Sequence, residues 1–165
     1  MRVVSYVILG IMVLIFFTSM NFYSTSNELL NYQLRTFYHA NIAHLLANGF
    51  SFYNLSFIED IIGSGQFLLA IVFISVVSSL LLYFYHKFVP SRKVLTVGFS
   101  GVIFGLFVVY FSLMGQNSIL SVGGLLLSII PQLLVPGISF EGHVCGIIAG
   151  CIYVLFFRPK RFMTK

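Results

Sequence analysis

Six apolar segments, each about 20 residues long and nearly free of charge, constrain this chain more than any other feature. They cover about residues 3–20, 37–58, 66–85, 94–113, 118–135 and 141–157. A helix needs about 20 predominantly apolar residues to cross the hydrocarbon core of a bilayer. Only 8% of the residues are charged and 59% are hydrophobic, whereas a globular domain carries about 25% charged residues. We therefore expect an all-α membrane protein, a six-transmembrane-helix bundle forming one domain over residues 1–165.

The charged residues lie at the ends of these segments, as they do around membrane spans. The net charge of +5 therefore does not indicate a nucleic-acid partner. The first apolar segment is longer than the core of a secretion signal and no Ala-x-Ala site follows it, so we expect a retained span. If the N-terminus is on the cytoplasmic side, that side carries five basic residues, all near the termini. The opposite side then carries four, at positions 35, 87, 92 and 93. This excess favours cytoplasmic termini only weakly.

The connections between the segments are short. Residues 21–36 form a polar connection, and Gly63, Ser64 and Gly65 are typical of a plain turn. Pro131 lies inside the fifth segment and Pro136 ends it, which predicts a kinked or frayed helix there.

Three of the apolar segments carry polar residues that we expect to share one depth. His44 and Asn48 lie in the second segment, Ser100 in the fourth and His143 in the sixth. These alternate segments run in the same direction, and His44, Ser100 and His143 each fall within about two turns of the start of their helix. A polar group inside a bilayer is costly unless it faces another one or a wet cavity. The four side chains are therefore expected to converge.

Glycines predict close contact between the fourth and sixth helices. They recur at four-residue spacing, the pattern that lets two helices touch, at Gly101 and Gly105 and at Gly142, Gly146 and Gly150. Ser100 precedes the first pair and His143 follows Gly142, so packing along these glycines should bring the hydroxyl and the imidazole together. Phe104 lies one turn after Ser100 on the same face and is expected to lie against the His143 ring.

These residue types are the parts of an acyl-transfer site. A serine beside a histidine base is a nucleophile, and His44 and Asn48, four residues apart on one helix face, can donate hydrogen bonds to an oxyanion. No carboxylate is placed to orient His143, so the sequence predicts a Ser-His dyad. His39 lies five residues before His44, off its face, and is expected to be structural. We expect no metal site and no cofactor.

The motifs resemble the rhomboid family of intramembrane serine proteases. The resemblance covers about residues 35–150 and rests on three motifs in order, on helices that run in parallel. They are His44-x-x-x-Asn48 after Arg35 and His39, Gly98-Phe99-Ser100-Gly101 with Phe104 and Gly105, and Gly142-His143-x-x-Gly146-x-x-x-Gly150. Glu59 followed by Gly63-Ser64 also looks like the family's second connection.

The resemblance implies a serine endopeptidase with a rhomboid-like bundle. Ser100 would be the nucleophile and His143 the general base and then acid, while His44, Asn48 and the Ser100 amide would stabilise the oxyanion. Gly98, Gly101, Gly142, Phe104 and His39 would support the site.

The resemblance also implies a partner and a location. The substrate would be a single-span membrane protein, cut near its outer boundary after a small side chain, and the fifth helix would gate its entry. The enzyme would lie in the cell membrane with cytoplasmic termini and a site open to the outer face. The short first connection and the lack of Trp depart from the family's longer first loop.

Two other functions stay open from the sequence. A rhomboid-like protein can bind or escort membrane proteins without cutting them, although such relatives lose the serine or the histidine. A small transporter is the other alternative, but the apolar segments have no carboxylate in their interior that could couple to a proton or cation, since Glu141 lies at the very start of the sixth.

Overall fold

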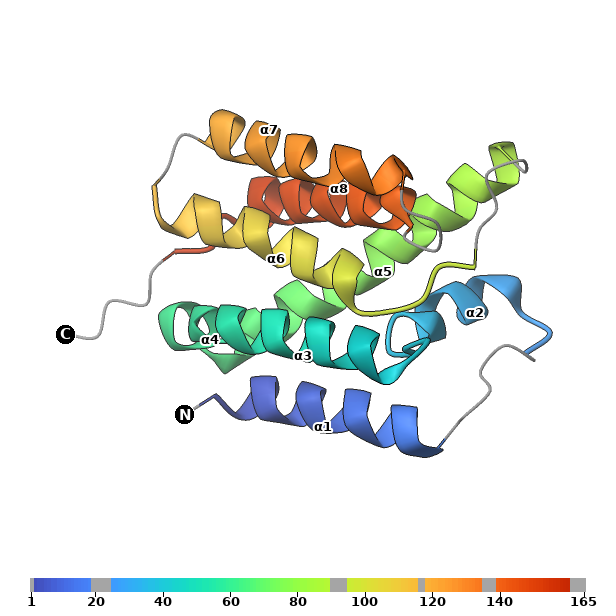
Figure 1. Ribbon diagram of the computed structural model, residues 1–165. Helices are drawn as coiled ribbons and strands as arrows, with labels where there is room; N and C mark the ends of the chain where they lie inside the picture. Colours follow the sequence, from blue (N-terminus) through green and yellow to red (C-terminus); the bar gives the residue numbers. More distant parts are fainter. Residues whose placement is uncertain (1, 19–24, 90–94, 116–117, 135–138, 161–165) are drawn as a thin grey trace.

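The regular elements are all helices in the computed structural model, which describes residues 2–18, 25–89, 95–115, 118–134 and 139–160 (Figure 1). In chain order they are α1 (Val3–Thr18), α2 (Glu28–Arg35), α3 (Ile42–Leu55), α4 (Phe57–Ile62), α5 (Ser64–Phe88), α6 (Ser100–Leu113), α7 (Ser118–Ile129), the 3-10 helix η3 (Ile130–Leu134) and α8 (Phe140–Phe157). The predicted all-α class is confirmed.

The helices alternate in direction along the bundle. Figure 1 shows α3, α6 and α8 beginning at the same end, opposite to the end where the two termini lie. Helix α8 packs against α6 and α5, and α7 covers α6 and α8, while α1 lies against α3. Large side chains such as Phe52, Phe99, Leu106 and Tyr153 fill the interior and are fully buried. This arrangement gives the three expected polar helices a common starting level.

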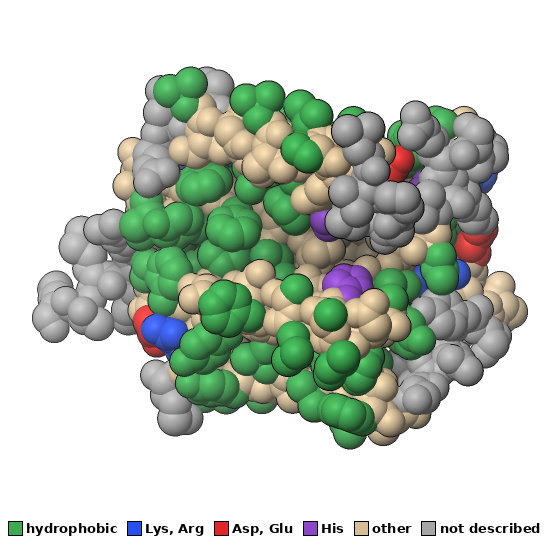
Figure 2. Space-filling view, viewed as in Figure 1, with side chains coloured by type: hydrophobic (Ala, Val, Ile, Leu, Met, Phe, Trp, Pro, Cys, Tyr) green, Lys and Arg blue, Asp and Glu red, His purple; other side chains and the backbone are tan. Residues whose placement is uncertain are grey.

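The outside of the bundle is apolar. Phe50, Leu120 and Phe156 are each more than 70% exposed, and hydrophobic side chains cover most of the face in Figure 2, with charged ones near its ends. Helices α5 and α8 are long and apolar enough to cross a membrane. Helices α1 and α6 and the stretch Leu120–Leu133 are shorter apolar helices. Exposed apolar area on this scale is typical of a surface that does not face water.

Several expected boundaries are wrong. Helix α3 begins at Ile42, not near residue 37, and α6 begins at Ser100, not near residue 94. Asn41 caps α3 because its side chain accepts a hydrogen bond from the His44 amide at 2.9 Å. Helix α5 is longer than expected at both ends. Arg92, Lys93 and Pro136 lie outside the described residues.

The expected polar connection at residues 21–36 contains a helix, α2. Asn27 accepts a hydrogen bond from the Leu30 amide, and Glu28 and Arg35 occupy the first and last turns, where their charges suit the helix dipole. The buried Tyr32 hydroxyl lies 2.8 Å from His86 Nδ1 of α5. The connection therefore includes a helix that packs against α5, which its polar composition did not predict.

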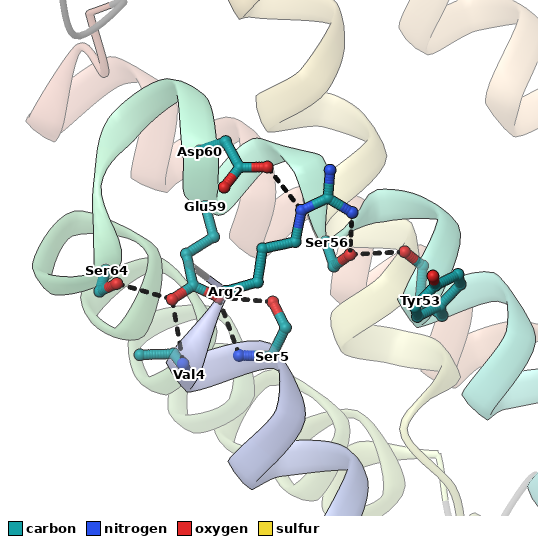
Figure 3. Close-up of polar contacts among 8 residues, drawn as sticks. All are labelled: Arg2, Val4, Ser5, Tyr53, Ser56, Glu59, Asp60 and Ser64. Atoms are coloured by element: carbon teal, nitrogen blue, oxygen red, sulfur yellow. Dashed lines mark hydrogen bonds and ion pairs between the residues drawn. The ribbon is translucent and has the colours of Figure 1, made fainter.

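A carboxylate ties α1 to the turn before α5 (Figure 3). Glu59 is 2% exposed and accepts hydrogen bonds from the Val4 and Ser5 amides at 3.0 and 2.9 Å, and from the Ser5 and Ser64 hydroxyls, both at 2.6 Å. Burial by itself raises the pKa of Glu59, but the four hydrogen bonds outweigh it and leave this pKa below its usual value. The turn predicted at Gly63, Ser64 and Gly65 is shorter than expected: Gly63, with φ of 82°, alone separates α4 from α5, and Ser64 and Gly65 already belong to α5.

The break predicted in the fifth segment is confirmed. Helix α7 ends at Ile129, and the chain continues as the 3-10 helix η3, which contains Pro131. Proline cannot donate to the i−4 carbonyl and its ring crowds the preceding turn, so the α-helix does not continue. The tighter helix sets the direction of the side chains that follow Pro131.

Candidate active site

Three of the candidate residues lie at the beginnings of their helices. Ser100 is the first residue of α6, His143 is in the first turn of α8, and His44 is in the first turn of α3. Ser139 starts α8, because its side chain accepts a hydrogen bond from the Gly142 amide. In Figure 2, histidine side chains reach the surface near the end of the bundle where α3, α6 and α8 begin.

Ser100 and His143 are directly paired. The Ser100 Oγ lies 2.8 Å from His143 Nε2, within hydrogen-bonding distance. The backbones of α6 and α8 touch beneath this pair. A methyl group on Gly146 would lie 2.7 Å from the Gly101 carbonyl carbon, and one on Gly150 would lie 2.5 Å from the Gly105 carbonyl oxygen. The glycine spacing thus brings the hydroxyl and the imidazole together.

His44 and Asn48 lie over Gly98, two residues before Ser100. A methyl group on Gly98 would lie 2.7 Å from His44 Cε1 and Nε2 and 3.1 Å from Asn48 Nδ2, and the φ of 108° also favours glycine there. The Gly98 amide donates a 3.0 Å hydrogen bond to the carbonyl of Arg35, at the end of α2. Helix α2 therefore anchors the loop that passes under both side chains.

The side chain of Asn48 has a buried hydrogen-bond donor that makes no hydrogen bond within the described residues. Its side chain is 5% exposed, and its Nδ2 has no partner among the described residues. A buried donor without an acceptor costs free energy, so Asn48 Nδ2 is available to an acceptor that enters the site. The first amides of α6, including that of Ser100, also have no acceptor within their own helix.

Two aromatic contacts surround the histidines. The Phe104 ring lies 4.4 Å from the His143 ring, centroid to centroid, at an angle of 32°. The buried His39 ring lies 5.2 Å from that of His44 in an edge-on arrangement. Neither ring nitrogen of His39 has a hydrogen-bond partner of good geometry among the described residues, although the ring also interacts with the backbone of Phe37.

One partner of His143 was missed by the sequence reasoning. Gln132, on η3, places its Oε1 2.5 Å from His143 Nδ1, the nitrogen that faces away from Ser100. The available signal was a single glutamine next to Pro131 in an otherwise apolar stretch. Its contact depends on the path of the 3-10 helix, which residue spacing alone does not give.

A small polar cavity of about 40 Å³ adjoins Ser100. Its polar lining comes from the end of α2, from α5 and from the loop before α6, and includes Tyr32, Thr36, Ser78, Ser79 and Thr96. A water needs roughly 10–15 Å³ of such volume together with polar partners, so the cavity has room for a few waters.

No group of three His, Cys, Asp or Glu side chains within residues 2–18, 25–89, 95–115, 118–134 and 139–160 could hold a metal ion. The site in this part of the chain consists of a hydroxyl, imidazoles, side-chain amides and helix N-termini. This is the set used in metal-free acyl transfer, and the expectation of no cofactor stays a prediction.

The helical bundle and its serine–histidine pair define a class of membrane proteins, and comparison with known sequences identifies it. The rhomboid domain matches residues 26–160. A protein of Acanthamoeba polyphaga mimivirus named "Putative rhomboid protein" is 59% identical over 161 residues, which cover 97% of this chain and 94% of the viral protein. The chain belongs to the rhomboid family and is a membrane protein with apolar helical spans.

Two plant proteins are similar over a smaller part of their length. Rhomboid-like protein 14, mitochondrial, of Arabidopsis thaliana is 34% identical over 140 residues, covering 73% of this chain and 41% of that protein. Rhomboid-like protein 15 of the same plant is 31% identical over 136 residues, covering 70% and 34%. The similarity therefore concerns the rhomboid domain and not the remainder of these longer proteins.

Proposed function

We propose that the protein is an intramembrane serine endopeptidase that cuts membrane proteins with a Ser-His dyad. The observation that carries the proposal is the 2.8 Å contact between Ser100 Oγ and His143 Nε2, held by helices in backbone contact. A serine hydroxyl is a weak nucleophile until a base accepts its proton, and an imidazole nitrogen at this distance can do so.

In the acylation step, Ser100 Oγ attacks the carbonyl carbon of the scissile bond while its proton moves to His143 Nε2. The tetrahedral intermediate then collapses, and His143 returns that proton to the leaving amine. The products are a new amino terminus and an ester on Ser100. Water from the cavity beside Ser100 then attacks the ester carbonyl while His143 takes its proton. The ester bond breaks, His143 returns the proton to Ser100 Oγ, and the second product leaves with a new carboxyl terminus.

The oxyanion formed in both steps needs donors. Asn48 Nδ2 is buried and unpartnered among the described residues, and it lies with the His44 ring over Gly98. Together with the Ser100 amide at the start of α6, these groups form the proposed oxyanion hole. Each donor in such a site typically contributes about 100-fold or more to turnover.

The substrate proposal rests on membership of the rhomboid family and on the position of the dyad near one end of the bundle. The proposed substrate is a single-span membrane protein cut after a small side chain near one membrane face, with entry past α7 and η3. The proposed orientation places both termini in the cytoplasm and the site toward the outside of the cell membrane. In this proposal α7 and η3 form the moving part, because the hydrogen-bond ladder between them is already interrupted at Pro131.

The test is labelling of the full chain in detergent with a fluorophosphonate, which reacts with activated serines. Wild type should be labelled, and Ser100→Ala and His143→Ala should not. Cleavage of a reconstituted single-span reporter with alanine near its outer boundary should follow the same pattern. If wild type is not labelled, or if Ser100→Ala is labelled equally, the protein is not a serine peptidase, and escort of membrane proteins becomes the better hypothesis.

A further inference from the structure

We propose that Gln132 is a positioning residue that fixes the orientation and the proton of His143, making a Ser100–His143–Gln132 relay in place of a simple dyad. This inference rests on the proposed function. It concerns an amide that comes from η3, a segment separate from the helices that carry the nucleophile and the base.

The geometry places Gln132 on the far side of the base. Its Oε1 lies 2.5 Å from His143 Nδ1, and Ser100 Oγ lies 2.8 Å from Nε2 of the same ring. Within the described residues these are the hydrogen-bond partners of the two ring nitrogens, and the Phe104 ring lies along the imidazole face. The imidazole is therefore held at both edges and on one face.

The chemistry gives this contact a direction. A neutral imidazole carries one N–H, and an amide oxygen can only accept a hydrogen bond. Gln132 Oε1 therefore selects the tautomer with its proton on Nδ1, which leaves the lone pair of Nε2 facing the Ser100 hydroxyl. The opposite tautomer would present an N–H to Ser100 and could not take its proton.

The same contact suits the charged intermediate. When His143 accepts the serine proton, both ring nitrogens become donors, and the Nδ1–H bond to Gln132 becomes charge-assisted. The amide dipole then stabilises the imidazolium without placing a permanent charge in an apolar bundle. A neutral residue avoids the desolvation cost of a carboxylate at this depth.

The test compares Gln132→Met, which keeps the side-chain length and removes the acceptor, with Gln132→Glu, which keeps an acceptor and adds charge. Gln33→Met is the matched control, because Gln33 Nε2 donates a 2.7 Å hydrogen bond to Ser75 on α5, away from the dyad. The measurement is the rate of fluorophosphonate labelling of the full chain in detergent, with thermal unfolding to verify folding.

Gln132→Met should lower the maximal labelling rate about 10- to 100-fold, the rate equivalent of one charge-assisted hydrogen bond, and leave the half-saturating probe concentration unchanged. Gln132→Glu should label within a few fold of wild type near neutral pH. Gln33→Met should behave as wild type.

The pH profile separates positioning from packing. With Gln132→Glu, the acidic limb of the labelling rate should move to higher pH, because a neighbouring carboxylate favours the imidazolium. The ionisable side chain that acts on His143 from another helix is His44 of α3, and Glu141 lies two residues earlier on α8. Both are present in every variant, so the shift reports residue 132. The pH profile of Gln132→Glu still tests the proposal if Gln132→Met fails to fold.

The inference is overturned if Gln132→Met labels as fast as Gln33→Met, or if Gln132→Glu is slow and its profile unshifted. In those cases wild type is still labelled, and the proposed peptidase function stands. Failure of wild type itself to react would remove both proposals together.

Discussion

Replacing Gly146 by alanine should separate Ser100 from His143, the proposed nucleophile and base, without directly contacting either side chain. The added methyl group would lie 2.7 Å from the carbonyl carbon and 2.9 Å from the Cα of Gly101, and closer still to its carbonyl oxygen. These are backbone atoms, so no side-chain rotation relieves the overlap. Carbon atoms pack at roughly 3.5 Å or more, so α6 and α8 must move apart by roughly 1 Å.

That movement acts on both activity and stability. The Ser100–His143 contact is 2.8 Å, and an added 1 Å takes it beyond hydrogen-bonding distance. A misplacement of about 1 Å in a catalytic site costs about 100-fold in rate, and overpacking costs about 1–3 kcal/mol of stability. For a chain of this size, that loss lowers Tm by roughly 3–10 °C.

The assay is fluorophosphonate labelling together with thermal unfolding of the detergent-solubilised protein. Gly10→Ala and Gly123→Ala are matched controls, because a methyl group at either helix position meets no atom within 4 Å. These controls should unfold at or slightly above the wild-type temperature, since alanine favours the helix over glycine. Gly146→Ala that reacts and unfolds like the controls would refute the argument that backbone contact sets the site.

Two other substitutions test separate parts of the molecule. Asn48→Ala should keep the fold and lower reporter turnover roughly 100-fold or more, and unchanged turnover would remove Asn48 from the proposed oxyanion hole. Glu59→Gln should destabilise the protein by about 2 kcal/mol above pH 5, because it weakens the hydrogen bonds that hold α1, whereas Asp60→Asn, at an exposed ion pair with Arg2, should change stability little. Because the pKa of Glu59 is lowered in the folded state, its stabilisation is complete above the ordinary value near 4.5 and is lost as the pH falls through the folded-state pKa. Unfolding temperatures between pH 3 and 7 should show this acid-side loss in wild type and a weaker one in Glu59→Gln.

The convergence of Ser100 and His143 could be predicted because it depends on two regular features. In helices that alternate in direction, the N-termini of every second helix lie at the same end of the bundle. Glycines four residues apart then mark the face along which two helices touch. The depth and the facing residues then follow from the sequence. The contact of Phe104 with His143 follows from the same spacing.

The parts that could not be predicted depend on irregular backbone. Helix α2 has eight residues and a polar composition, so its packing on α5 gives no long apolar signal. The Gln132 contact arises because the chain after Ile129 changes to a 3-10 helix, which turns the side chain toward α8. The burial of Glu59 depends on how the first turn of α1 meets α4, a long-range contact that local sequence does not encode.

The contact between α6 and α8 also determines which positions of the sequence can change without altering the site. Main-chain atoms of Gly101, Gly105, Gly146 and Gly150 set the spacing of the two helices. The distance between Ser100 and His143 therefore does not depend on which hydrocarbon side chains cover the exterior. Substitutions at lipid-facing positions can therefore adapt the chain to a thicker, thinner or differently composed bilayer without changing the spacing of α6 and α8, which the four glycines set.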